Sequence, residues 1–143
     1  MPEKETLERA EKDKREGKAA ATQAGEFVRE EIQHVREGKH GARSTKQVIA
    51  IGLSKARRAG VKLRPPKNAS KKTQEQAARD TRKGKSTGKG KKRSRATLGA
   101  LKREGGSAAT KKALSRQARS AAAKRSAASR SRSARKAGAT RKK

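Results

Sequence analysis

Side chains that could catalyse a reaction or bind a metal are scarce in this sequence. It contains no cysteine, which excludes disulfides, thiolate metal sites and cysteine nucleophiles. His34 and His40 are the two histidines, and no cysteine or nearby carboxylate constellation in the sequence completes a metal site with them. Ser54 has no base and orienting group around it, and the glycine-rich segment 84–90 lacks the spacing and the preceding strand of a phosphate loop. We therefore expect no enzymatic activity, no metal and no cofactor.

The abundant chemistry is that of lysine and arginine. The 143 residues include 43 Lys and Arg against 13 Asp and Glu, which gives a formal net charge of +30. Lysine and arginine form charge-assisted hydrogen bonds to phosphate oxygens and displace the counterions that a nucleic acid holds. A charge excess of this size indicates a polyanionic partner.

The charge is unevenly distributed along the chain. Residues 1–37 hold ten acidic and eight basic side chains, whereas residues 38–66 hold eight basic side chains and no acid. Residues 67–143 hold 27 basic side chains and three acidic ones. We therefore expect the N-terminal stretch to lie outside the binding surface. Its acidic helix could fold back on the basic segments and compete with the polyanion.

Two groups of basic residues are candidate phosphate ligands. The first group, between Gly38 and Pro66, comprises Lys39, Arg43, Lys46, Lys55, Arg57, Arg58, Lys62 and Arg64. The second group, in the C-terminal tail, comprises Lys91, Lys92, Arg93, Lys111, Lys112, Arg116, Lys124, Arg125, Arg135 and Lys136. Free N–H groups at the N-terminus of a predicted helix, beside Arg43 and Lys46, also favour an anion. The alternatives are that the first group only solvates helix ends and that the tail only improves solubility.

The tail has no means of reading a base sequence. A coil rich in Gly, Ala and Ser holds no side chain against base edges, so we expect affinity with low sequence specificity. If about ten phosphates are engaged, log K falls with log salt at a slope of roughly −9. Phe27 is the only aromatic residue and lies on a predicted packing face. Because single-strand and sequence-specific RNA binders stack bases on several aromatic rings, duplex DNA is favoured over RNA.

Two predicted helices position the first group. Over residues 22–37, Val28, Ile32 and Val35 recur at helical spacing, and Gly38 follows where a left-handed residue ends a helix. Phe27 flanks this face, and the charged residues of the helix, Glu30 and Glu31 among them, are predicted to lie away from it.

The second helix follows a capping box. The Ser44 hydroxyl can accept from the N–H of Gln47, whose side chain reaches back. Ile49 and Leu53 then lie on one apolar stripe, and Gly60 supplies the stop.

These helices predict an antiparallel hairpin whose apolar core is small. A core of this size usually needs help to fold. The N-terminal helix could pack on the hairpin, the hairpin could form a dimer, or it could become ordered on its ligand. Since Leu7 is nearly the only large apolar side chain of residues 3–16, we expect that helix to be exposed and to fray, ending at Gly17.

The sequence after Pro66 is of low complexity. Residues 70–83 could form a helix, residues 84–95 read as a linker, and residues 108–143 are an Ala/Ser/Lys/Arg tract. Low hydrophobicity and high net charge predict that this tract is mostly coil in water. The expected fold is therefore mostly α, a helical hairpin or three-helix module with a long, largely disordered basic tail. The boundaries are 1–21 for the N-terminal helix, 22–66 for the hairpin module and 67–143 for the tail.

Part of the module resembles a family of unknown function. The segments from Val28 to Lys39 and from Ser44 to Gly60 resemble small basic bacterial proteins with a KQAIAIALSEARKAG-like helix. Val48, Gly52, Lys55 and Arg58 depart from that pattern, with Lys55 expected to make the surface more basic. The resemblance implies a bacterial origin and brings no catalytic residues. The tail is similar in composition to the tails of linker histones and bacterial histone-like proteins.

Together these features predict a non-enzymatic, histone-like protein that binds nucleic acid with low specificity, duplex DNA before RNA. With no apolar stretch long enough to span a membrane and no secretory signal, we expect a cytoplasmic protein of the bacterial nucleoid. One alternative is an RNA- or ribosome-associated protein. The other is an interaction module, in which the hairpin of residues 22–60 binds a protein partner or a second copy and the tail only localises it.

Overall fold

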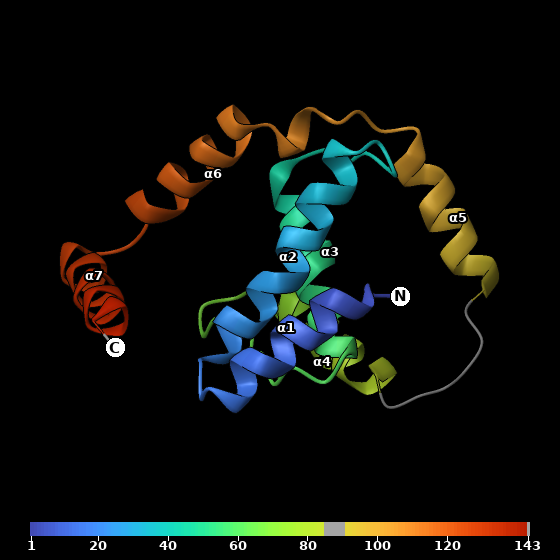
Figure 1. The fold of residues 1–143 in the computed structure, drawn as a ribbon. Helices are drawn as coiled ribbons and strands as arrows, with labels where there is room; N and C mark the ends of the chain where they lie inside the picture. The colour runs from blue at the N-terminus through green and yellow to red at the C-terminus, as the bar shows by residue number, and fades with distance from the viewer. Residues whose placement is uncertain (85–90, 143) are drawn as a thin grey trace. The chain divides into compact units, whose positions relative to one another are not determined.

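The computed structural model describes residues 1–84 and 91–142, and it describes side chains from residue 94 onward in the second range. All regular secondary structure in these residues is helical (Figure 1). The chain divides into two compact units, residues 1–110 and 111–143. The helices of the first unit are α1 (Lys4–Arg15), α2 (Ala20–Arg36), α3 (Thr45–Arg58), α4 (Lys71–Gly84), α5 (Lys91–Lys102) and the short 3-10 helix η1 (Ser107–Ala109). The second unit contains α6 (Lys111–Ala123) and α7 (Ala127–Arg141).

The predicted helix ends are confirmed. Gly17, Gly38 and Gly60 all have φ between +71° and +96°, and each follows the C-cap residue of its helix. At the last of them the N–H of Gly60 donates to Arg57 and that of Val61 to Ala56, which is the Schellman arrangement. The Ser44 hydroxyl accepts from the N–H of Gln47, as the capping box predicted.

The hairpin is formed by α2 and α3, which pack side by side (Figure 1). Gly52 lies at a close approach of the two helices, because a Cβ built there would be 2.6 Å from the Cα of Val28. Phe27 and Ala24 of α2 meet Ala56 of α3 in one buried cluster. The predicted packing faces therefore form the interior of the hairpin.

Helix α1 packs on α2, so the expectation of an exposed helix is wrong. Its buried residues are Thr6, Ala10 and Asp13, spaced so that they share one face. Ala10 joins the cluster of Phe27, and Arg9 forms an ion pair with Glu26 at 2.8 Å. These small side chains let α1 pack closely on α2. They carry no large apolar group that would mark the packing face in the sequence.

Helix α4 packs on α3 through a buried carboxylate. Asp80 is 1% exposed and accepts from the Ser54 hydroxyl at 2.7 Å. The Arg58 guanidinium lies 2.9 Å from the other carboxylate oxygen. Gly84 lies against the backbone of Arg58, where a Cβ would be 2.3 Å from the carbonyl oxygen. Helix α4, which lies in the segment expected to be tail, is therefore part of the folded module.

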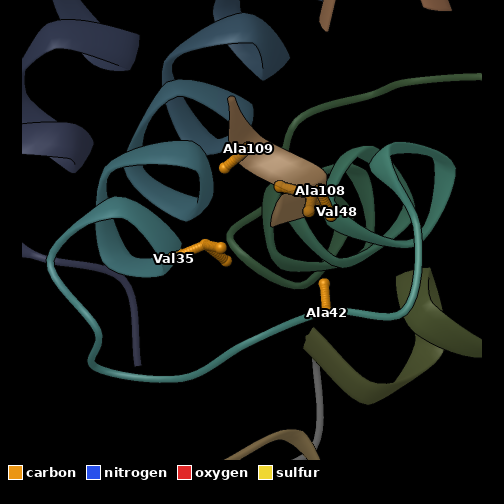
Figure 2. Packing of buried hydrophobic residues seen from close by; sticks show 5 residues of the cluster. All are labelled: Val35, Ala42, Val48, Ala108 and Ala109. Atoms are coloured by element: carbon orange, nitrogen blue, oxygen red, sulfur yellow. The ribbon is translucent and has the colours of Figure 1, made fainter. Parts of the chain in front are cut away.

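Residues 103–110, which we call the strap, also belong to the first core. Ala108 and Ala109 pack with Val35, Ala42 and Val48 (Figure 2). The Thr45 hydroxyl donates to the carbonyl oxygen of Ala108 at 2.6 Å, and Arg36 Nε donates to that of Ala109 at 2.9 Å. The strap is held by small apolar residues and by hydrogen bonds from side chains to its backbone carbonyls, which low-complexity composition does not reveal.

The prediction of a long, largely disordered tail is wrong, because residues 111–141 form α6 and α7 with one short break. Alanine, arginine, lysine and glutamine are strong helix formers, and Ser126 caps α7 by accepting from the N–H of Ser129. This helix propensity outweighs the charge repulsion that predicted a coil. Within the described residues, no helix has both the length and the apolar character needed to cross a membrane.

Candidate nucleic-acid interface

Lys55 is a half-buried residue of the hairpin. Its Nζ lies 3.0 Å from Glu30 Oε1 and also contacts Glu31 Oε1, and both carboxylates are 1% exposed. Burial acts to lower the pKa of Lys55, but the hydrogen bond and charge of Glu31, followed by those of Glu30, raise it above its ordinary value. Burial likewise acts to raise the pKa of Glu30, and hydrogen bonds from Lys55 and the Glu3 N–H lower it more. This ion cluster corrects two expectations, since the two glutamates do not point away from the packing face and Lys55 does not enlarge the basic surface.

Three further cations of the first group form ion pairs. Lys39 lies 3.1 Å from Glu3 and 3.1 Å from Glu37, and hydrogen bonds with these carboxylates raise its pKa. Arg58 is paired with Asp80, and Arg43, which is mostly exposed, lies 3.3 Å from Glu104. The N-terminal segment therefore does fold back on a basic residue, at the pair of Glu3 and Lys39.

The remaining cations of the first group are Arg57, Lys46, Lys62 and Arg64. Arg57 is half-buried and donates to the carbonyl oxygen of Leu63 at 3.1 Å. Lys46, Lys62 and Arg64 are exposed, and none of the described acidic residues lies within ion-pair distance of them. The module thus offers fewer available cations than the sequence indicated.

The second unit presents its cations to solvent. Every described Lys and Arg from residue 111 to 142 is exposed, and this stretch contains no acidic residue. On α6, Lys112, Arg116 and Arg119 are spaced by four and three residues and therefore share one helical face. Lys124 is exposed, and Arg125 donates to the carbonyl oxygen of Ser129 in the first turn of α7.

The structure describes the side chains of some of the remaining predicted tail residues and not those of others. Arg135 and Lys136 are exposed neighbours on α7, and Lys111 begins α6. The structure does not describe the side chains of Lys91, Lys92 and Arg93. The candidate interface therefore lies within residues 111–142, and Lys46, Lys62 and Arg64 are separate candidates on the first unit.

A cluster that sequence reasoning missed lies at one end of the hairpin. His40 Nε2 is 3.2 Å from Glu31 Oε2, and His34 Nδ1 is 3.7 Å from Glu31 Oε1. The expectation that no carboxylate accompanies the histidines is therefore wrong. The spacing of Glu31 and His34, one helical turn apart, was the available signal, whereas the approach of His40 depends on the fold of the loop after Gly38.

Comparison with family models matches residues 13–68 to a family of unknown function, DUF6496. The resemblance seen in the sequence, to an uncharacterised family, is thereby confirmed. The matched span begins within α1 and includes α2, α3 and the cluster of Glu31, His34 and His40. Neither the curated proteins nor the solved structures give a match.

Proposed function

We propose that this chain binds duplex DNA with low sequence specificity by neutralising phosphates, without catalysing a reaction, and acts as a histone-like protein of a bacterial nucleoid. The proposal rests on the exposure of the cations in the second unit. All of its described cations are exposed and none has an acidic neighbour within the unit, so they are available to phosphates. Neutralising phosphates releases counterions, which supplies affinity without sequence readout.

The helical state of α6 and α7 favours DNA over RNA. The major groove of B-form DNA admits an α-helix and has a phosphate backbone on each side. The major groove of A-form RNA is deep and too narrow to be read by side chains. On α7, Arg132 and Arg135 share one helical face and Arg130 lies on the opposite side of the axis, which suits contact with phosphates on both sides of a groove.

The packing of the first unit weighs against the alternative of a protein-docking hairpin. That alternative needed an exposed apolar stripe on residues 22–60. In the described part of the chain, Ala10 of α1 and Ala108 and Ala109 of the strap pack against the buried residues of α2 and α3. RNA association remains the rival that the experiment must separate.

A charge-matched pair of variants tests the proposal. Replacing Lys112, Arg116 and Arg119 with glutamine removes the positive charges from one face of α6 and keeps a good helix former at each position. Replacing Lys12, Lys14 and Arg15 of α1 with glutamine changes the net charge by the same amount on the acidic segment.

Each lost phosphate contact should lower the magnitude of the slope of log K against log salt by about 0.9. In fluorescence anisotropy with random-sequence duplex DNA, the three substitutions of the α6 variant should therefore lower this magnitude by up to about 2.7. The α1 variant should keep the wild-type slope. Equal slopes for both variants would contradict the proposal, and tighter binding to double-stranded RNA of the same sequence would favour the RNA alternative.

A further inference from the structure

Three potential metal ligands converge at the end of the α2–α3 hairpin. Glu31 and His34 lie one turn apart on α2, and the loop after Gly38 brings His40 to them. One potential ligand atom from each of the three residues lies within 4.8 Å of the other two. We propose that Glu31, His34 and His40 bind a divalent transition-metal ion of the zinc class.

The outer nitrogen of each imidazole already faces an acceptor. His40 Nδ1 lies 3.0 Å from the carbonyl oxygen of Gly41, and His34 Nε2 lies 2.8 Å from Glu3 Oε1. A carbonyl or an ionised carboxylate can only accept, so each of these nitrogens carries a proton, and in a neutral imidazole the other ring nitrogen then has the lone pair. The lone pairs of His40 Nε2 and His34 Nδ1 are then on the side of Glu31. Metal-binding histidines have this arrangement, in which the other ring nitrogen donates to a carbonyl or carboxylate.

Glu31 Oε2 lacks a donor. It is buried and accepts no hydrogen bond from any described residue, although His40 Nε2 is 3.2 Å away. With the lone pair of the imidazole on that side, two acceptors face each other, and a buried acceptor without a donor is costly. A metal ion between the two atoms satisfies both of them.

The distances suit a small ion. In a tetrahedral zinc site with ligands about 2.0–2.1 Å from the metal, neighbouring ligand atoms are about 3.3 Å apart. The separation of 3.2 Å between His40 Nε2 and Glu31 Oε2 already matches this value, and His34 Nδ1 lies 3.7 Å from Oε1, the other oxygen of the same carboxylate. Two imidazoles with one carboxylate favour zinc, cobalt or nickel over calcium or magnesium, which prefer oxygen ligands.

The local charge also favours a divalent cation, in contrast to the net charge of +30. The ion-pair network around the cluster contains four carboxylates and two ammonium groups, from Glu3, Glu30, Glu31, Glu37, Lys39 and Lys55. With neutral histidines it carries a charge of −2, which one divalent ion neutralises. Lys55 contacts Glu31 at Oε1, which leaves Oε2 for the metal.

The site is placed to stabilise the first unit. The N–H groups of Gly41 and Ala42, directly after His40, donate to the carbonyl oxygens of Leu101 and Gly105. A metal that holds His40 on α2 therefore fixes the loop on which the end of α5 and the strap dock. Since an ion that binds only the folded state raises stability, zinc should raise the Tm.

Titration of the full-length protein with Zn²⁺ tests the site, because both imidazoles of the chain belong to it. In ¹⁵N-imidazole NMR, His34 and His40 should shift together and saturate at one equivalent of zinc, with a rise in Tm. Co²⁺ should bind with the same stoichiometry and show the visible absorption of a nitrogen-coordinated ion. Imidazole signals that do not move at several equivalents of zinc would overturn the proposal.

Variants assign the ligands. His34→Gln and His40→Gln should each weaken zinc binding at least tenfold. Glu8→Gln, which removes an exposed carboxylate of α1, should leave the affinity unchanged. Circular dichroism verifies that each variant is helical, and binding that both histidine variants retain contradicts the assignment whatever their stability. The wild-type NMR titration decides the proposal if either variant fails to fold.

Discussion

Gly52 sets how closely α2 and α3 approach each other. A Cβ there would be 2.6 Å from the Cα of Val28, a backbone atom that cannot rotate away. We expect Gly52→Ala to separate the helices and to lower the free energy of unfolding by about 1–3 kcal/mol, as overpacking does. Gly25→Ala is the matched control, because Gly25 is also inside a helix but has no atom within 4 Å of the built Cβ.

Urea unfolding measures both variants. Gly25→Ala should be neutral or stabilising by up to about 1 kcal/mol, because alanine has the better helix propensity. If Gly52→Ala were equally stabilising, the close contact of the two helices would be wrong.

Single residues show where sequence reasoning reached its limit. Phe27 and Val35 are buried, as their positions on the predicted packing face indicated. Lys55 could not be recognised as half-buried and ion-paired from the sequence, because its partners Glu30 and Glu31 lie on another helix and a lone basic residue on a helix is usually solvated. Charge counted along the chain therefore overestimated the available cations of the module.

At the scale of elements, α4 is anchored on α3 by Asp80. Burial acts to raise the pKa of Asp80, but hydrogen bonds from Ser54 and Arg58 lower it below its ordinary value of 3.8. A carboxyl with a depressed pKa in the folded state contributes stability that is fully present above its unfolded pKa. That contribution is lost as the pH falls through the folded pKa.

We therefore expect the difference in unfolding free energy between wild type and Asp80→Asn to be constant from pH 7 to about pH 5 and to shrink below about pH 4. Urea unfolding at each pH measures the difference. Glu75→Gln, at an exposed position of the same helix, should show no comparable dependence. A difference that stays constant down to pH 3 would mean that the Asp80 carboxylate does not anchor α4.

The elements that sequence reasoning predicted well are those with large apolar residues and clear ends. The hairpin of α2 and α3 has both, with Gly38, Gly60 and the Ser44 cap marking its limits. The packing of α1 was one of three open alternatives and that of the strap was not predicted, because both depend on alanine and threonine, which occur throughout the chain. Ala10 and Ala109 have no sequence signal that separates them from the alanines of α6, and only their partners in space make them core residues.

At the scale of the whole molecule, the acidic residues and the buried clusters both belong to the first unit. All 13 acidic side chains precede residue 110, and so do all residues of the two described cores. Removing residues 111–143 therefore removes 13 cations and no described core residue. Stability and affinity should consequently depend on different parts of the chain.

Two truncations separate these contributions. A chain that ends at Thr110 should keep the urea midpoint of the full-length protein and lose most of its affinity for duplex DNA, because α6 and α7 are absent. A chain that ends at Pro66, the boundary expected from composition, lacks Asp80, Ala108 and Ala109 and should unfold at lower urea. Equal urea midpoints for the two truncated chains would show that α4 and the strap contribute nothing to the core. Unchanged DNA affinity in the chain ending at Thr110 would move the interface to Lys46, Lys62 and Arg64 of the first unit, the exposed cations that no described acid pairs.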